Sequence, residues 1–258
     1  MIFSESYNIP SYLCDRTDHL QLWGAARLLQ EVAEHHTDLT HIGFHDLMQQ
    51  GRAWVLCRMY YQISAMPAVN KKVILKTWSR GTDGLFALRD YSIEDEIGNH
   101  YVSATSNWAV IDFEKRRVCR LSNIMDNYEH HDQLATERQA LGKLLASDVS
   151  NQDPQIVIPI QNSMLDHTNH VNNAEYVKWI IDQIPEDLVF HHIKSFEIDY
   201  ITETHPGDAV RLFIQSDSSE INHQPKTPST FCTESIADYF IQINNSRGVS
   251  ALSRVIFA

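Results

Sequence analysis

Two stretches of the chain carry apolar residues at helical spacing. Residues 20–33 repeat an apolar side chain every three or four positions, and residues 176–184 do the same until Pro185 ends the pattern. The second stretch is apolar on most of its sides, which predicts a buried helix. The pattern therefore predicts one helix in each half of the chain.

Runs with the character of strands follow each of these stretches. They are rich in β-branched and aromatic residues and are separated by Gly-, Asn- and Asp-containing turns that suit hairpins. The predicted strands cover residues 54–63, 73–78, 86–93, 101–112, 117–121, 194–201, 209–215, 231–244 and 249–257. A buried helix followed by antiparallel strands, occurring twice, predicts an α+β fold.

The segments that precede the two helices look like copies of each other. Residues 15–20 and 166–171 both read Asp-x-Thr-(Asp/Asn)-His followed by an aliphatic residue, and Asp166 lies 151 positions after Asp15. This match and the shared order of elements predict an internal duplication. We expect a first domain at residues 1–130 and a second at 153–258.

A polar segment, residues 131–152, connects the two predicted domains. Four of its residues, Leu134, Arg138, Leu141 and Leu145, recur at helical spacing. The sequence therefore predicts a linker helix.

Composition excludes several classes of protein. The chain has 258 residues, of which 43% are hydrophobic and 21% charged, which is typical of a packed globular protein. Its first residues lack the features of a signal peptide, and no apolar run approaches the length of a membrane span. The four cysteines, Cys14, Cys57, Cys119 and Cys232, form no CxxC pair and are predicted to be free thiols. These features predict a cytoplasmic protein.

The net charge and the histidines bear on two further classes, nucleic-acid-binding proteins and metalloproteins. The net charge of −12 argues against a general nucleic-acid-binding protein, which needs a basic surface. Four histidines crowd residues 35–45, but their spacing fits no metal site that we can justify, and we interpret them as part of a polar helix end.

The segment before the second helix has the strongest chemical character. The chain lacks GxSxG, HExxH and a Gly-rich phosphate loop. Residues 166–173, in contrast, place a carboxylate (Asp166) and an imidazole (His170) directly before a helix, whose first N–H groups can stabilise an oxyanion. The alternative is that Asn172 or Asn173 only caps the helix while Asp166 and His170 bond to the loop backbone. The residues alone leave both interpretations open.

A family resemblance favours the catalytic interpretation. The pattern Leu165-Asp166-x-x-x-His170-Val171-Asn172-Asn173-x-x-Tyr176-x-x-Trp179 resembles the signature of fatty acyl-acyl carrier protein (acyl-ACP) thioesterases. Further matching segments are residues 29–33, 54–58, 77–78, 89–91, 106–112 and 200–208.

The resemblance implies a fold, a reaction and a set of site residues. The fold is a double hot-dog, with two antiparallel sheets that each wrap around a central helix. The reaction is hydrolysis of acyl thioesters on the phosphopantetheine arm of the carrier protein, without a metal or organic cofactor. The implied catalytic residues are Asp166, His170 and a strand residue, Glu203. The supporting residues, for orientation or for the oxyanion, are Thr168, Asn169, Asn172 and Asn173.

Two positions depart from the family pattern. The family usually has Asn two residues after the Asp, where this chain has Thr168, with Asn169 one place later. Some members have Cys after the Glu, where this chain has Thr204, so a cysteine nucleophile is not available there.

The internal repeat predicts a division of labour. Alignment of residues 206–210 with 69–73 places Met66 opposite Glu203. We therefore expect that only the second half is catalytic and that the first mainly accommodates the acyl chain. The expected mechanism is attack by water, with Glu203 or Asp166 as the general base and His170 orienting the water or polarising the substrate.

The expected partner is acyl carrier protein, with no nucleic acid and no membrane span; a homodimer is left open. Because carrier proteins are acidic and this chain is too, docking would need a local basic patch, for which the candidates are Lys115, Arg116, Arg117 and Arg120, or Lys71 and Lys72. The alternatives are an acyl-CoA thioesterase on the same fold, a non-catalytic module that binds acyl thioesters, and a hot-dog dehydratase, whose sites use a different His-Asp/Glu context.

Overall fold

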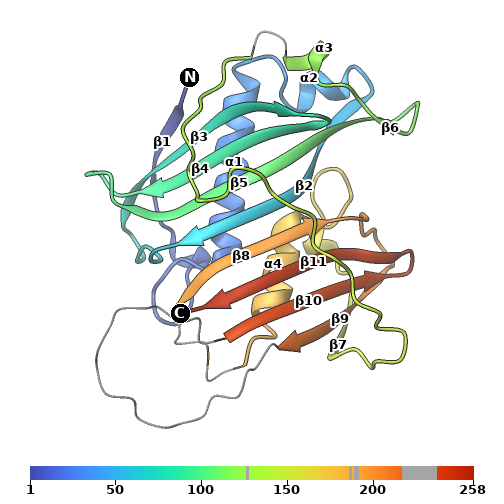
Figure 1. Cartoon of the computed structure of the whole chain (residues 1–258). Coiled ribbons are helices and arrows are strands. Elements are labelled where there is room, and N and C mark those ends of the chain that lie inside the picture. Colours follow the sequence, from blue (N-terminus) through green and yellow to red (C-terminus); the bar gives the residue numbers. More distant parts are fainter. Residues whose placement is uncertain (126–127, 186–187, 189–191, 217–236) are drawn as a thin grey trace. The chain divides into compact units, whose positions relative to one another are not determined.

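The computed structural model describes residues 1–125, 128–185, 188, 192–216 and 237–258 (Figure 1). The chain divides into two compact units. The first consists of residues 1–143 and 172–179, and the second of residues 144–171 and 180–258.

The first unit contains a long helix and an antiparallel sheet. In chain order its elements are β1 (Phe3–Asn8), η1 (Ser11–Leu13), α1 (Leu22–Asp38), α2 (Phe44–Met48), β2 (Arg52–Ile63), β3 (Lys72–Asp83), β4 (Phe86–Glu94), β5 (His100–Asp112), β6 (Arg117–Val118) and α3 (Ser122–Met125). The strands follow the order β1-β3-β4-β5-β2, with β6 paired to β5 (Figure 1). Helix α1 contacts β3 and β1, and its apolar face is buried as the sequence pattern predicts.

The second unit repeats this plan. Its elements are β7 (Ile156–Pro159), η2 (Asn162–Met164), β8 (Ile193–Tyr200), β9 (Ala209–Ser216), β10 (Ala237–Asn245) and β11 (Gly248–Phe257). Helix α4 (Asn173–Ile181) lies between η2 and β8 in the chain, and its residues 173–179 belong to the first unit. The strand order is β7-β9-β10-β11-β8, which matches β1-β3-β4-β5-β2 strand for strand. The α+β prediction and the internal duplication are therefore confirmed.

Most predicted elements are present, with shifted ends. Both helices begin where the chain leaves a 3₁₀ turn and a short bridged loop, at Leu22 and Asn173. The predicted strand at 117–121 is only two residues long because α3 follows it at Ser122, and residues 231–236 of another predicted strand lie outside the described part of the chain. The sequence analysis missed β1, β7, α2 and α3. Both strands lie at an edge of their unit's sheet order and are too short to show a strong alternation.

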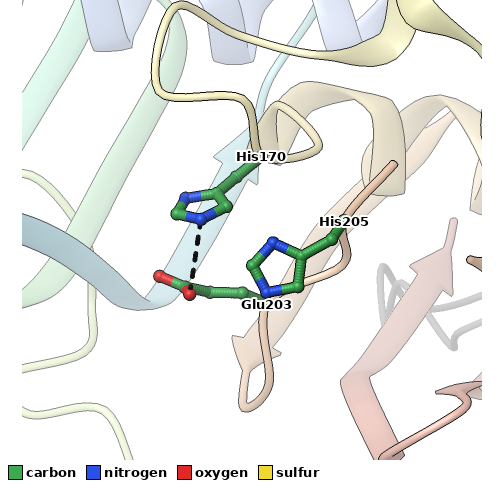
Figure 2. A group of neighbouring side chains, drawn as sticks. All are labelled: His170, Glu203 and His205. Carbon is green, nitrogen blue, oxygen red and sulfur yellow. Dashed lines mark ion pairs between the residues drawn. The ribbon is translucent and has the colours of Figure 1, made fainter. Parts of the chain in front are cut away.

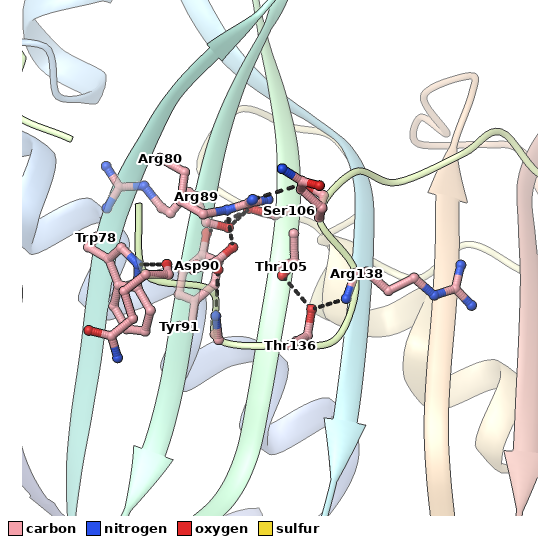
Figure 3. A network of polar contacts seen from close by, with 12 residues as sticks. Trp78, Arg80, Arg89, Asp90, Tyr91, Thr105, Ser106, Thr136 and Arg138 are labelled. Atoms are coloured by element: carbon pink, nitrogen blue, oxygen red, sulfur yellow. Dashed lines mark hydrogen bonds and ion pairs between the residues drawn. The ribbon is translucent and has the colours of Figure 1, made fainter. Parts of the chain in front are cut away.

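The predicted linker helix is wrong. Residues 128–143, which we call the strap, run without helix along the first unit. The Ala135 N–H donates to Asp90 (2.7 Å), and the Trp78 indole donates to the Gln133 carbonyl (2.9 Å; Figure 3). Because side chains of the sheet satisfy strap backbone groups, the strap does not need helical hydrogen bonds.

The Asp90 carboxylate is the centre of this attachment. It is fully buried and also forms an ion pair with Arg80 (2.9 Å; Figure 3). Burial raises the pKa of Asp90 above its ordinary value, although the bonds from Ala135 and Arg80 act in the opposite direction. Of the apolar stripe predicted for a helix, Leu141 is buried while Leu145 is 79% exposed, so these side chains do not share one face.

Most of helix α4 belongs with the first unit. Arg27 of α1 forms an ion pair with Glu175 (2.8 Å), whose residue is only 6% exposed, and the Lys178 ammonium lies over the Trp23 ring. The compact units thus divide the chain differently from the predicted domains, which gave all of α4 to residues 153–258. The predicted domain boundaries and the roles of the two halves stay predictions.

Two smaller expectations concern membranes and cysteines. Among the described residues, no helix combines the length and the apolar character that a membrane span requires. Cys14, Cys57 and Cys119 are free thiols as predicted, whereas Cys232 lies outside the described residues.

Candidate active site

The loop at residues 165–171 is held by its own backbone. Leu165 and Val171 form an antiparallel bridge. The Asp166 N–H donates to the His170 carbonyl (2.8 Å), and the Asn169 N–H donates to the Asp166 carbonyl (3.0 Å). Asn169 has φ of 64°, in the left-handed region that Asn tolerates better than most residues. The structure therefore places Asn169 at the turn of the loop.

The Asp166 carboxylate organises the same loop. Its Oδ1 accepts hydrogen bonds from the Thr168 hydroxyl (2.6 Å), the Thr168 N–H (2.8 Å) and the His170 N–H (3.2 Å). Asp166 therefore reaches the imidazole through Thr168, and its first contribution is to fix the loop.

Thr168 determines which nitrogen of His170 carries a proton. Its Oγ1 lies 3.2 Å from Nδ1 of His170. Because the hydroxyl proton is directed to Asp166, Oγ1 can only accept from the imidazole, so Nδ1 is protonated. In neutral His170 the free lone pair is then on Nε2.

Nε2 of His170 faces Glu203 (Figure 2). It lies 3.7 Å from Oε2 of that carboxylate, which is too long for a direct hydrogen bond but short enough for one water beside the pair to hydrogen-bond to both atoms. The side chains of His170 and Glu203 are 31% and 46% exposed, so water has access to both. The sequence-predicted His and Glu are thus brought together by the fold.

A second imidazole, from His205, also lies at this site (Figure 2). The His205 ring meets the His170 ring edge to face, with centroids 4.7 Å apart. One ligand atom each of His170, Glu203 and His205 lie within 4.8 Å of one another. The sequence analysis missed His205, whose only signal was its place two residues after Glu203.

The turn between β10 and β11 positions the loop that carries Glu203. The Asn245 amide and the Arg247 guanidinium both donate to the Glu203 carbonyl, at 3.0 and 2.6 Å. Arg247 also forms an ion pair with Asp208 (2.7 Å), whose carboxylate accepts the His205 N–H (2.9 Å). Glu203 lies in the connection between β8 and β9 and not within a strand, which corrects the expectation from the resemblance.

Asp208 is the charged residue through which the loop that carries Glu203 is bonded to the β10–β11 turn. Partial burial raises its pKa, but the hydrogen bonds from His205, Ser246 and Arg247 outweigh burial and leave the pKa below the ordinary value. Neither Asn245 nor Arg247 was predicted, because nothing in the sequence relates a hairpin turn to a loop about forty residues earlier.

The remaining predicted residues have structural partners. Asn172 Oδ1 accepts the Ala174 N–H (2.9 Å) and so caps α4, as the alternative interpretation proposed, and Asn173 is the first residue of the helix. Thr204 is 1% exposed and accepts a hydrogen bond from the Asn245 amide (3.1 Å), so its side chain is packed inside.

The first unit contains the same loop with a different neighbour. The Thr17 hydroxyl donates to Asp15 (2.6 Å), as Thr168 does to Asp166. The Leu20 N–H donates to the Pro67 carbonyl (2.9 Å), as the Val171 N–H does to the Thr204 carbonyl (3.0 Å).

These matched hydrogen bonds set the register between the two copies. Pro67 corresponds to Thr204, so Met66 corresponds to Glu203 and Ala68 to His205. The register agrees with the predicted alignment of Met66 with Glu203.

Comparison with known proteins identifies the family. The model of the acyl-ACP thioesterase N-terminal domain matches residues 1–128, and that of the acyl-ACP thioesterase C-terminal domain matches residues 150–247. The chain belongs to the acyl-ACP thioesterase family.

Two relatives that are similar to the chain in sequence are plant proteins. The chain is 26% identical over 239 residues to oleoyl-acyl carrier protein thioesterase 2, chloroplastic, of Arabidopsis thaliana, covering 84% of this chain and 63% of that protein. It is 25% identical to the chloroplastic dodecanoyl-[acyl-carrier-protein] hydrolase of Umbellularia californica, covering 79% and 56%. The chain thus spans about three fifths of the length of these relatives.

Solved structures with the same fold cover the whole chain. An acyl-ACP thioesterase from Bacteroides thetaiotaomicron superposes with a TM-score of 0.83 at 22% identity, covering 100% of this chain and 98% of that one. The 12:0-ACP thioesterase from Umbellularia californica superposes with a TM-score of 0.79 at 19% identity, covering 100% and 97%. This acyl-ACP thioesterase family member has the double hot-dog fold.

Proposed function

We propose that the chain hydrolyses the thioester of fatty acyl-ACP and releases free fatty acid, ending fatty acid synthesis. The observation that carries the proposal is the arrangement Asp166–Thr168–His170 with the free Nε2 lone pair facing Glu203 at 3.7 Å. Membership of the acyl-ACP thioesterase family supports the choice of reaction.

The geometry suggests how water is activated. A water molecule between His170 Nε2 and Glu203 would donate one proton to each, because both groups accept. Its oxygen lone pair is then available to attack the thioester carbonyl carbon while Glu203 takes the proton. Asp166 is less suited to be the base, since its Oδ1 already accepts three hydrogen bonds from the loop.

Collapse of the tetrahedral intermediate completes the reaction. The carbon–sulfur bond breaks, the fatty acid leaves, and the phosphopantetheine thiolate takes up the proton held by Glu203. Backbone amides at the start of α4, near Asn172 and Asn173, are the proposed oxyanion donors. The absence of any cofactor requirement stays a prediction.

The β5–β6 turn is the candidate docking patch for the acidic carrier protein. Lys115, Arg116 and Arg117 are all exposed there, followed by exposed Arg120. Lys115 pairs with Asp112 (2.9 Å), which leaves the two following arginines as the stronger candidates for long-range attraction. At the alternative site, Lys72 pairs with Glu96 (2.7 Å).

The cytoplasmic location and the homodimer stay predictions. The plant relatives are named chloroplastic.

The test is thiol release from medium- and long-chain acyl-ACPs and from the matching acyl-CoAs. We expect the wild-type protein to prefer the carrier-protein substrates, and Asp166→Asn, His170→Ala and Glu203→Gln to lose most of this activity. Equal rates on acyl-CoA would favour the acyl-CoA thioesterase. Binding of acyl-ACP without any release by the folded protein would favour the non-catalytic module and refute the hydrolase.

A further inference from the structure

Three side chains of the site, those of His170, Glu203 and His205, place possible metal-ligand atoms close together. Two imidazoles and one carboxylate make up a common set of protein ligands for catalytic Zn²⁺, in which a fourth position is left for water. Their ligand atoms lie within 4.8 Å of one another, and each of the three residues is at least partly exposed, so an ion can enter from solvent.

The distances are close to those that zinc needs. With bonds of about 2.0–2.2 Å, the ligands of a tetrahedral zinc ion lie roughly 3.3–3.6 Å apart. The His170 Nε2 to Glu203 Oε2 distance is already 3.7 Å. The third ligand, His205, has to approach by about 1 Å, which a change of side-chain torsion supplies.

Surrounding groups prepare two of the ligands for metal binding. The Nδ1–H of His170 donates to Thr168, which fixes the ring and keeps the lone pair on Nε2, as second-shell partners of metal-binding histidines do. The backbone on either side of the third ligand is fixed as well, since Asp208 accepts the His205 N–H and Arg247 holds the Glu203 carbonyl.

Comparison of the two copies of the loop suggests a substitution that tests zinc binding. The first copy has an Asp and a His in the same hydrogen-bonded loop, but Met66 and Ala68 stand where the second copy has Glu203 and His205. The proposed hydrolysis uses Glu203 and assigns no role to His205. The backbone at this position accepts alanine in the first copy, so His205→Ala is a substitution that the fold tolerates.

We propose that His170, Glu203 and His205 form a Zn²⁺ site and that zinc binding there inhibits hydrolysis. The inhibition rests on the proposed function. Zinc would occupy the Nε2 lone pair and the Glu203 carboxylate, which are the two acceptors that the attacking water needs. The metal-free protein is the active form, and zinc binding switches it off reversibly.

The experiment measures binding and activity separately on the full chain. Zn²⁺ binding is followed by calorimetry, and Co²⁺ binding by the visible absorption of tetrahedral cobalt. We expect one ion per chain for the wild-type protein. His205→Ala should weaken zinc binding by at least about tenfold, since even outer-shell changes cost that much. Its thermal midpoint should match that of the wild-type protein.

A matched control lies in the first unit. His100 Nε2 is 3.7 Å from a carboxylate oxygen of Glu94, the same separation as in the His170–Glu203 pair. His100→Ala should leave zinc binding unchanged. An equal loss of affinity in His100→Ala and His205→Ala would show that zinc binds nonspecifically to His–Glu pairs and would overturn the site.

Activity assays test the inhibition. Zinc should stop thiol release by the wild-type protein, and a chelator should restore it. His205→Ala, with its rate compared with its own metal-free rate, should need more zinc for the same fractional inhibition. Activation by zinc would overturn the inhibitory role. If no variant hydrolyses any substrate but His205→Ala still loses zinc, the proposed function fails and the metal site stands. If the protein hydrolyses acyl-ACP but binds no zinc specifically, the metal site is overturned and the proposed function stands.

Discussion

The loops at residues 14–20 and 165–171 have nearly the same hydrogen bonds but different neighbours. In both, a Thr hydroxyl donates to an Asp at 2.6 Å and a residue in the left-handed region, Asp18 or Asn169, forms the turn. The neighbouring loop presents Met66 to the first copy and Glu203 to the second. The Asp-x-Thr-x-His motif is therefore a structural scaffold, and the facing loop decides whether a carboxylate lies beside its imidazole.

The same comparison extends to the hairpin turns that hold the facing loops. In the first unit Lys72, near the loop, pairs with Glu96 in the β4–β5 turn. In the second unit Asp208 pairs with Arg247 in the β10–β11 turn. The charges are reversed. In the second unit the turn also donates a hydrogen bond to the carbonyl of Glu203, the residue that carries the carboxylate.

The largest effect should come from Glu203→Gln. Gln has nearly the same shape but cannot take a proton, so we expect kcat/KM for acyl-ACP to fall by about 10²- to 10⁴-fold. Met66→Gln, at the corresponding position of the first copy, should change kcat/KM little. Similar losses in both variants, measured by thiol release, would refute the division between the two halves.

Thr168→Val should have the next largest effect. Without the hydroxyl, His170 loses the acceptor for its Nδ1–H and can turn away from Glu203, so kcat should fall by about 10²-fold with little change in KM. Thr168→Ser should restore much of the rate, and Thr17→Val should leave it near the wild-type value. If Thr168→Ser is as impaired as Thr168→Val, packing of the methyl group matters more than the hydrogen bond.

Arg247→Ala should reduce the rate less. The guanidinium holds the Glu203 carbonyl from a partly exposed position, so its loss should loosen the carboxylate and lower kcat/KM roughly tenfold. Lys72→Ala removes the ion pair with Glu96 in the β4–β5 turn of the first unit and should leave kcat/KM unchanged. A loss of rate in Lys72→Ala would show that the first unit also sets the catalytic geometry.

Asp15→Asn should have the smallest effect, on stability alone. Partial burial raises the pKa of Asp15, but hydrogen bonds from Thr17 and His19 outweigh it, so the pKa lies below its ordinary value. The ionised form then stabilises the fold above pH 4 or so, and this contribution is lost as the pH falls through the lowered pKa.

Denaturant unfolding at two pH values measures this contribution. We expect Asp15→Asn to lower the free energy of unfolding at pH 7 by at most about 1 kcal/mol, because the residue is largely exposed despite its partial burial and solvent screens its interactions. The difference from the wild-type protein should shrink at acid pH. A difference that stays constant with pH would mean that the Asp15 charge is not what stabilises the loop.

The sequence by itself determined the repeated plan and the loop. Hydrophobic periodicity located both helices and nine strands, because burial of an apolar face requires that spacing along the chain. The Asp-x-Thr-x-His motif acts over five residues, so its hydrogen bonds are local and could be anticipated from the Asp166 and His170 spacing. The resemblance supplied Glu203, which the residues alone did not.

Only the tertiary structure decided what faces the loop and how the connection runs. His205 and Arg247 join the site because strand pairing brings the ends of β8, β9, β10 and β11 together, and no local pattern encodes that meeting. The strap was also misjudged from local sequence. Its apolar residues are spaced as in a helix, but Asp90 and Trp78 of the sheet bond to its backbone and hold it without helix. Local patterns report local hydrogen bonds, whereas competing partners far along the chain become available only once the sheet has formed.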